Sequence, residues 1–189
     1  MMFDSQNTPS RHLHHRASTR RQGYDYSLAG AYFITLVTYH RDCLFGEIVD
    51  DEMKLNHRGK IVQEEWFASV EIRKEIRLFP DEFVVMPNHI HGILWIVENE
   101  HDPAVGANGR SPLHDHPHMK PKSLSSFVAG FKSSVTKRIR DELHETGIWQ
   151  RNYYDRIIRN DRELDAIRKY IETNPRHWAE DDEKPMSLN

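Results

Sequence analysis

EFVVMPNHIHGILWIVE (82–98) decides the fold of this chain, because it holds two apolar runs separated by Pro87 and Asn88. Short apolar runs bounded by turn residues are typical of buried strands. Within the second run, His89 and His91 are two positions apart, and on a strand such residues point to the same face of the sheet. We expect this strand to be central in its sheet and buried on both faces.

The elements on either side of this stretch indicate the fold class. We expect strands at 31–40 and 153–159, helices at 56–76 and 123–141, and a last helix that begins at Asp161 and is stopped by Pro175. The order is strand, helix, strand, strand, helix, strand, with one extra helix. It predicts an α+β fold with a ferredoxin-like βαββαβ antiparallel sheet and two helices on one face. The other face is left for the C-terminal helix, which carries Tyr170, and for function.

The composition is that of an ordinary globular domain. The chain has 189 residues, of which 38% are hydrophobic and 29% charged. No window approaches the roughly 20 apolar residues that a membrane span needs, and the first residues contain no apolar secretory segment. The single cysteine, Cys43, excludes an intramolecular disulfide framework and fits a reducing compartment. We therefore expect a cytoplasmic protein with no membrane partner.

The chain divides into three parts. We expect a basic, disordered arm at 1–22, one domain at 23–178 and an acidic tail at 179–189. Within the domain, the segment 99–122 is rich in Gly, Pro, Asn and His and has almost nothing to bury. We expect this segment to form a mobile excursion loop.

Two segments are locally basic, although the formal net charge is −3. No acid occurs within 11–21 or within 120–140. Because phosphate binding depends on local patches rather than on net charge, these segments are candidates for contacts with nucleic-acid phosphates. The alternative is a solvated tail and a solvated helix face. The candidate phosphate-binding residues are Arg20, Arg21, Lys120, Lys122, Lys132, Lys137, Arg138 and Arg140.

The histidine pair is a candidate metal site. Two imidazoles side by side on a buried strand can share one ion, whereas a buried polar group without a partner costs about 1–3 kcal/mol. The same spacing at 12/14, 114/116 and 116/118 lies among loop residues, where nothing fixes the rings. The alternative is a pair of core histidines with satisfied hydrogen bonds. Histidine-triad hydrolases are excluded, because position 93 is Ile93 rather than a third histidine.

The last helix carries a candidate nucleophile. Leu164, Ile167 and Ile171 form its core-facing stripe, and Tyr170 lies on the flank of that stripe. Asn174 is four residues later and therefore projects from nearly the same face. Its amide oxygen could complete a His-His-Asn metal site with the hydroxyl beside it. Helix geometry alone favours a boundary tyrosine that packs its ring, and it allows Asn174 equally well as an ordinary helix terminator.

Four blocks of sequence resemble a known family. They are AYFITLVT (31–38), MPNHIHGIL (86–94), WQRNYYDRIIR (149–159) and YIETNP (170–175). In this order and spacing they resemble the REP-associated tyrosine transposases, which belong to the single-tyrosine HUH transposases of insertion sequences. The resemblance covers roughly residues 23–178.

The resemblance implies a chemistry and its residues. Tyr170 matches the nucleophile, and His89, His91 and Asn174 match the ligands of a divalent metal, Mg²⁺ or Mn²⁺. The implied reaction cuts and rejoins single-stranded DNA beside a hairpin through a 5′-phosphotyrosine intermediate. The implied protein is a monomer or homodimer associated with the bacterial nucleoid. Tyr153 and Tyr154 are rival nucleophiles, although paired aromatics on a strand usually reflect ring packing.

Three other functions stay open at this point. A non-catalytic nucleic-acid-binding module derived from a transposase would bind hairpins without forming an adduct. A relaxase or replication initiator often carries its tyrosine before the histidine pair, whereas Tyr170 follows His91 by 79 residues (170 − 91). An unrelated metallohydrolase would cleave DNA and leave no protein attached.

Overall fold

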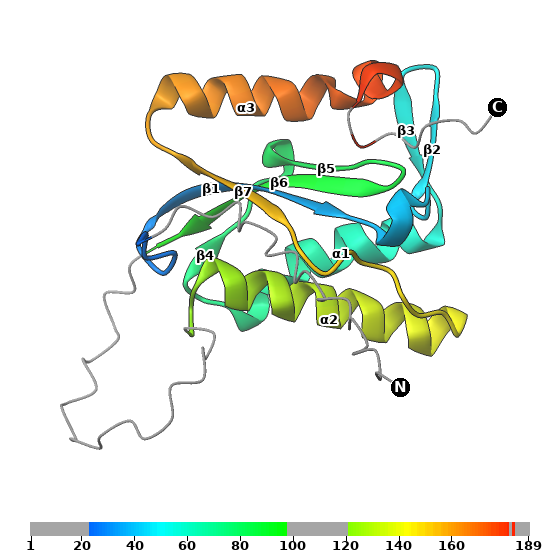
Figure 1. The fold of residues 1–189 in the computed structure, drawn as a ribbon, viewed down its shortest axis with the longest axis horizontal. Helices are drawn as coiled ribbons and strands as arrows, with labels where there is room; N and C mark the ends of the chain where they lie inside the picture. The colour runs from blue at the N-terminus through cyan, green and yellow to red at the C-terminus, as the bar shows by residue number, and fades with distance from the viewer. Residues whose placement is uncertain (1–22, 98–120, 182, 184–189) are drawn as a thin grey trace, which may run out of the picture.

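The computed structural model describes residues 23–97, 121–181 and 183. In these ranges the chain forms an α+β fold with an antiparallel sheet and three α-helices (Figure 1). The helices are α1 (His57–Ile72), α2 (Leu124–Leu143) and α3 (Asp161–Thr173). The main sheet contains β1 (Gly30–Val37), β4 (Ile76–Arg77), β5 (Phe83–Val85), β6 (His89–Ile96) and β7 (Tyr154–Ile158). The expected α+β class and antiparallel sheet are confirmed.

The histidine strand β6 lies inside the sheet, as expected. The strand order is β4-β6-β1-β7, and β5 also pairs with β6. The register between β1 and β6 sets Thr35 opposite His91, and the register between β1 and β7 sets Thr35 opposite Tyr154. Residues directly opposite each other share a face. These three side chains therefore belong to one face of the sheet.

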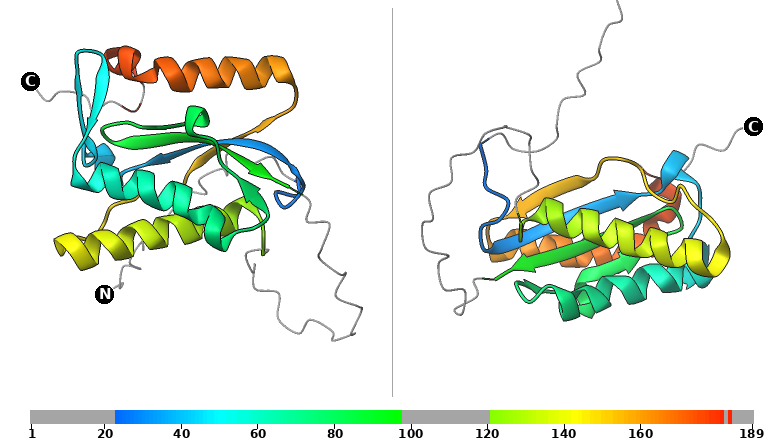
Figure 2. Two further views of the ribbon diagram at one scale, coloured as in Figure 1. Left: turned by 180° about the vertical axis from the view of Figure 1, so that it is seen from behind. Right: turned by 90° about the horizontal axis from the view of Figure 1, so that it is seen from below.

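The helices cover the two faces of the sheet unequally. Helices α1 and α2 pack together on one face, and α3 lies alone on the other (Figures 1 and 2). On the α1/α2 side, the ring of Trp66 sits directly over Gly92, where an added Cβ would approach the ring to 2.5 Å. Trp66 is also stacked on Phe83, with ring centroids 4.6 Å apart. The glycine after the histidine pair thus makes room for the largest side chain of the core.

Each α-helix begins at a residue whose side chain caps it. Asn56 accepts a hydrogen bond from the backbone of Gly59 at the start of α1, Ser123 forms a capping box with Ser126, and Asn160 caps α3. Such caps satisfy N–H groups that have no partner within the helix. They explain why the helices begin where the sequence indicates.

One expected boundary needs correction. Helix α1 ends at Ile72 instead of continuing to residue 76, because Ile76 pairs with Ile96 to form the short strand β4. A hairpin that the sequence did not indicate, β2 (Gly46–Val49) and β3 (Glu52–Leu55), precedes α1, and its turn places Asp50 and Asp51 at positive φ, as type I′ turns require. Helix α3 ends at Thr173, before Pro175 as expected, and the chain continues through the 3₁₀ segment η3 (Asn174–Glu180).

Two short 3₁₀ segments complete the described elements, η1 (Tyr39–Arg41) and η2 (Pro80–Glu82). No helix within the described ranges combines the length and apolarity needed to cross a membrane. The predicted arm at 1–22 and nearly all of the predicted loop at 99–122 lie outside the described residues.

Candidate active site

The two histidines at the start of β6 meet on the face covered by α3. Both side chains are buried, and their Nε2 atoms are 3.0 Å apart. Each ring is oriented through its other nitrogen, since His89 Nδ1 lies 2.8 Å from the Asn88 Oδ1 atom and His91 Nδ1 lies 2.9 Å from the Thr35 hydroxyl. The Asn88 oxygen can only accept, so Nδ1 of His89 donates and its Nε2 keeps a lone pair. Such bonds fix metal-ligating histidines in proteins.

Burial keeps both imidazoles neutral. It lowers the pKa of His89 to about 4, although Asp181 and Asn174 nearby act in the opposite direction. Burial, followed by the neighbouring His89, lowers the pKa of His91 well below its usual value. A metal binds only the unprotonated nitrogen of histidine. At neutral pH both rings are therefore in the form that can act as ligands.

Tyr170 reaches this pair from α3. Its hydroxyl oxygen lies 3.1 Å from His91 Nε2, and its ring meets Phe33 edge to face with centroids 6.1 Å apart. The side chain is still 44% exposed. The phenol oxygen therefore contacts the histidine pair, while the ring remains accessible to solvent and hence to a substrate.

An ion pair and an apolar stripe fix α3 over the sheet. Leu164, Ile167 and Ile171 pack on Ala31 and Ile93, as the helical spacing predicts. Arg168, on the same helix, donates two hydrogen bonds of 2.9 and 2.6 Å to the fully buried carboxylate of Glu82. Trp95 Nε1 donates to the other oxygen of the same carboxylate at 2.7 Å.

Asn174 contributes an amide oxygen to which no described residue donates a hydrogen bond. The residue begins η3 and is 2% exposed. Its Nδ2 donates to Asp181 at 3.3 Å, while its Oδ1 is buried without a hydrogen bond from any described residue. A buried oxygen left in this state requires an explanation, and an ion is a common one. Asn174 therefore fits the ligand role that the sequence predicts for it.

Asp181 is a site residue that the sequence did not reveal. The nearest side-chain oxygen of Asp181 lies 3.9 Å from His89 Nε2, and the ligand atoms of His89, His91 and Asp181 all fall within 4.8 Å of one another. The surrounding residues, AEDDEKP (179–185), are typical of a solvated acidic tail. Only the path of η3, which brings the chain back over β6, places this carboxylate beside the histidines.

The ligand atoms gathered at this site suit a divalent metal ion. Two imidazole nitrogens, an amide oxygen and a carboxylate oxygen are usual ligands for such ions. Two ligands bound ~2.1 Å from one ion at right angles are about 3 Å apart, which matches the 3.0 Å between the histidine nitrogens. The residues present therefore fit the implied ion.

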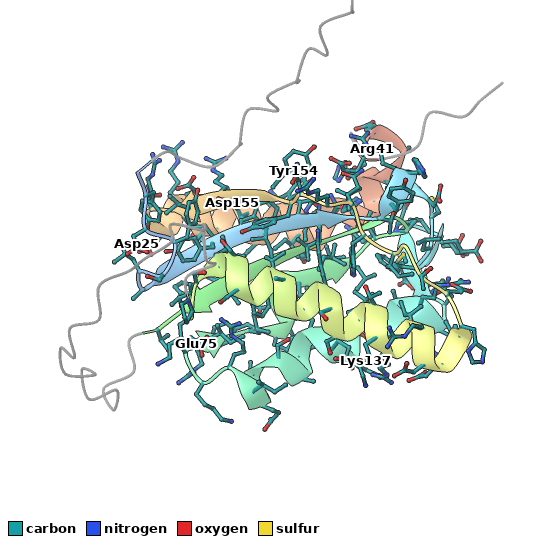
Figure 3. All side chains as sticks on the ribbon, turned by 60° about the horizontal axis from the view of Figure 1, so that its bottom comes forward. Asp25, Arg41, Glu75, Lys137, Tyr154 and Asp155 are labelled. Carbon is teal, nitrogen blue, oxygen red and sulfur yellow. The ribbon has the colours of Figure 1, made fainter. Side chains whose placement is uncertain are left out.

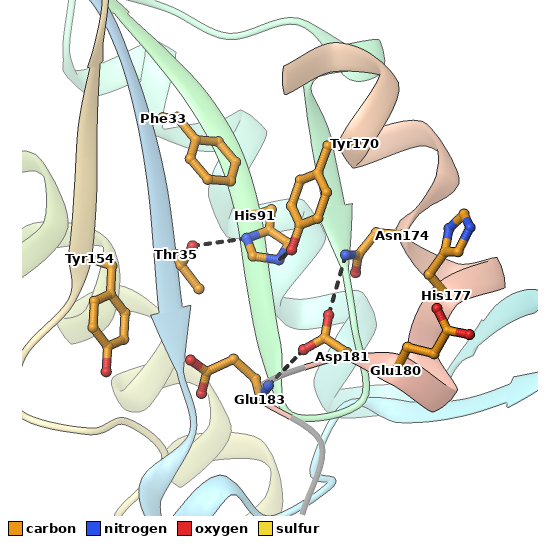
Figure 4. Close-up of a pocket in the computed structure, with 10 residues that line it drawn as sticks. All are labelled: Phe33, Thr35, His91, Tyr154, Tyr170, Asn174, His177, Glu180, Asp181 and Glu183. Carbon is orange, nitrogen blue, oxygen red and sulfur yellow. Dashed lines mark hydrogen bonds between the residues drawn. The ribbon is translucent and has the colours of Figure 1, made fainter. Parts of the chain in front are cut away.

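A cavity of about 460 Å³ opens in front of these groups (Figure 4). It lies between β1 and β7 on one side and α3 with η3 on the other. Its lining residues are Phe33, Thr35, His91, Tyr154, Tyr170, Asn174, His177, Glu180, Asp181 and Glu183.

The rival tyrosines differ in position. Tyr153 packs against the core on the α1/α2 side. Tyr154 points to the α3 side and lines the cavity. Of the two tyrosines that line the cavity, it is Tyr170 whose hydroxyl contacts His91.

The basic residues of α2 are not brought to this cavity. Helix α2 covers the opposite face of the sheet, and Lys137 projects from it toward solvent (Figure 3). Arg138 forms ion pairs with three carboxylates, those of Glu64, Glu65 and Glu142.

Lys132 is engaged within the protein as well. It donates to the backbone oxygens of Gln150 and Asn152 at 2.7 and 3.0 Å, and burial lowers its pKa to about 8. Lys122 and Arg140 belong to the described residues, and Arg140 lies beside Asp141. The other three predicted contacts, Arg20, Arg21 and Lys120, lie outside the described residues.

The chain is similar in sequence to two curated proteins and in fold to solved structures. No family model matches the chain. A protein of Haemophilus influenzae, described only as uncharacterized, is 37% identical, and the match covers 89% of this chain and 93% of that protein. A second protein of Haemophilus influenzae, named "Putative REP-associated tyrosine transposase", is 24% identical over 80% of this chain and 73% of its own length. The solved structure of a REP-associated tyrosine transposase bound to a REP hairpin shares the fold, with a TM-score of 0.54 and 20% identity over 84% of this chain and 74% of that one.

Proposed function

Because the chain is similar in sequence to a putative REP-associated tyrosine transposase and shares the fold of one bound to a REP hairpin, we propose that it is a member of that family and cuts and rejoins single-stranded DNA beside a hairpin. In this proposal Tyr170 is the nucleophile, and His89, His91 and Asn174 hold a divalent metal, with Asp181 as a fourth ligand. The observation that carries it is the 3.1 Å contact between the Tyr170 hydroxyl and His91 Nε2. A nucleophile and a metal site that arise from distant parts of the chain thus converge in one cavity.

The proposed reaction exchanges one phosphodiester for another. The Tyr170 oxygen bonds to the scissile phosphorus, the bond from phosphorus to the 3′ oxygen breaks, and the phenol proton ends on the released 3′-hydroxyl. The product is a 5′-phosphotyrosine, which a second 3′-hydroxyl can attack to restore a DNA strand and free the tyrosine. Because a free phenol has a pKa of about 10, it needs help at neutral pH. A divalent ion, Mg²⁺ or Mn²⁺, would supply that help by offsetting the charge that develops on the phosphate.

The chain's own residues orient the nucleophile. Phe33 packs against both the Tyr170 ring and His91, which limits where the phenol can move. The ion pair between Arg168 and Glu82 sets the position of α3 along the sheet. Because Tyr170 contacts His91 of its own chain, the proposed activity needs no exchange of α3 between subunits. A monomer contains the proposed nucleophile and all the proposed metal ligands.

The strand order supports a ferredoxin-like topology. We propose that the sheet corresponds to the ferredoxin-like βαββαβ arrangement, with β5 and β4 together in the place of one strand. The face covered by α3 would then be the catalytic face.

The basic residues of α2 and of the arm would contact DNA away from the cleavage site. Lys137 and Arg140 have exposed side chains on the α1/α2 side, a position that suits the duplex of a hairpin rather than the scissile strand. Lys122 precedes α2, and Lys120, Arg20 and Arg21, which lie outside the described residues, are further proposed phosphate contacts. Binding through these cations would weaken as salt rises, because it releases counterions. Lys132 and Arg138 are engaged within the protein and would contribute least.

The test is covalent capture. The protein is mixed with Mn²⁺ and end-labelled hairpin DNA that carries a single-stranded extension, then denatured. We expect a labelled adduct that is lost in Tyr170→Phe and when a chelator is present. Tyr39→Phe, which alters a tyrosine of similar exposure in η1, should form the adduct normally.

Each other outcome selects a different function. An adduct that persists in Tyr170→Phe would transfer the nucleophile to Tyr154 or Tyr153. Hairpin binding without any adduct would indicate a non-catalytic module. Cleavage that leaves no protein attached would indicate a metallohydrolase.

A further inference from the structure

Tyr154 exposes its ring beside the proposed nucleophile. It stands on β7, and its pairing with Thr35 directs the side chain into the cavity that also holds Tyr170 (Figure 4). The ring is 46% exposed, and it stacks on no aromatic ring within the described residues. A single exposed tyrosine is common on protein surfaces. Its position in the same cavity as the proposed nucleophile is what makes this one informative.

The cavity has a neutral end and an acidic end. Phe33, Thr35 and Tyr154 form the neutral end, on the strands. Glu180 and Asp181 form the acidic end, beside η3, whereas the Glu183 carboxylate extends toward Tyr154 (Figure 4) and is offset by an ion pair with Arg41 at 3.2 Å. Tyr170 and His91 lie between the two. Carboxylates repel a phosphate backbone, so a strand that reaches Tyr170 is favoured to approach over the neutral end.

The free ring at the neutral end matches an unpaired nucleobase. Phe33 is already occupied, since it stacks on His91 and meets Tyr170 edge to face. Tyr154 is therefore the ring on which a base can stack. A cavity of about 460 Å³ lies within the range of roughly 300–1,000 Å³ in which small ligands are held. Single-stranded DNA is commonly bound through stacking on aromatic side chains, which accepts any base.

From this geometry we infer that Tyr154 is the stacking platform for the nucleobase next to the scissile phosphate. The inference rests on the proposed function and adds a substrate contact to it. Tyr154 binds the strand through one base, and it takes no part in bond making. Its ring is needed, and its hydroxyl is dispensable.

Binding is measured in Tyr170→Phe protein, which cannot cut. The probe is hairpin DNA whose single-stranded extension carries one 5-iododeoxyuridine, moved position by position. We expect ultraviolet light to cross-link one position to the peptide that contains Tyr154. Adding Tyr154→Ala should weaken binding of the extension roughly 5- to 100-fold, the range for loss of one stacked base, and adding Tyr154→Phe should leave binding nearly unchanged. Tyr39→Ala, the matched control, should have no effect.

Kinetics with Tyr170 present separate this inference from the proposed function. Tyr154→Ala should raise the KM for DNA and leave adduct formation at saturating DNA within a few-fold. Equal KM in Tyr154→Ala and the unaltered protein would overturn the inference, as would equal losses in Tyr154→Phe and Tyr154→Ala. Absence of any adduct in the unaltered protein would instead overturn the proposed function.

Discussion

The two faces of the main sheet are built from the same strands and differ in what they bury. On the α1/α2 face, Trp66 lies at the centre of a large cluster of aromatic and aliphatic side chains. On the α3 face, the apolar cluster is small. The buried positions on that face also include five polar residues, His89, His91, Thr35, Glu82 and Asn174.

The difference follows from the alternation of side chains along β1 and β6. In β6, Ile90 and Leu94 contribute to the large core, while His91 and Ile93 face α3. Burying unpaired polar groups opposes folding, so the apolar face must supply stability that the polar face lacks. Changes on the first face should therefore affect folding, and changes on the second should affect metal and DNA.

The largest expected effect is on the apolar face. Trp66→Ala should reduce the free energy of unfolding by about 3–5 kcal/mol, the usual cost of removing a buried tryptophan. Urea unfolding followed by circular dichroism measures it. The control on the other face is Tyr170→Phe, which should change the free energy by less than about 1 kcal/mol because the ring remains. Equal losses in the two variants would mean that the faces do not divide stability from function.

A smaller effect is expected at the polar face, where a substitution should change metal affinity rather than stability. Asn174→Ala should weaken Mn²⁺ binding by about 10- to 100-fold, measured by calorimetry. Because the Asn174 oxygen has no partner among the described residues, its removal should change stability without metal by no more than about 1 kcal/mol.

Asn160→Ala, at the other end of α3, is the matched control. Asn160 caps the helix by accepting from the Glu163 backbone, so this variant should lose about 1 kcal/mol of stability and retain metal affinity. Unchanged Mn²⁺ affinity in Asn174→Ala would remove Asn174 from the ligand set.

Local patterns in the sequence predicted much of this arrangement. Period-two alternation placed His89 and His91 on one face, and four-residue spacing placed Tyr170 and Asn174 on one side of a helix. Whether the helix and the strand meet depends on the whole chain. Helix geometry left that question open, and only the family resemblance proposed an answer.

Contacts between distant segments could not be read from the sequence. The segment 120–140 contains no acid, yet α1 supplies Glu64 and Glu65 to Arg138, so a basic stripe in sequence is partly neutralised in space. Asp181 belongs to the expected acidic tail, but η3 turns it back onto His89. Both results reflect tertiary packing, which composition within a window does not encode.

The smallest expected effect concerns how the polar face responds to acid. The folded-state pKa of His89 is about 4, and that of His91 is also depressed, whereas both should be near 6.5 in the unfolded chain. Below pH 6.5 these two histidines therefore bind protons in the unfolded chain but not in the folded protein. The free energy of unfolding consequently falls as the pH is lowered toward 4. Each histidine contributes a slope of up to about 1.4 kcal/mol per pH unit. Urea unfolding of metal-free protein between pH 7 and 4.5 should show a shallower slope in His89→Gln than in the unaltered protein. Identical slopes in the two proteins would mean that the His89 ring is not buried as a neutral group, and the two faces would then differ less than their side chains indicate.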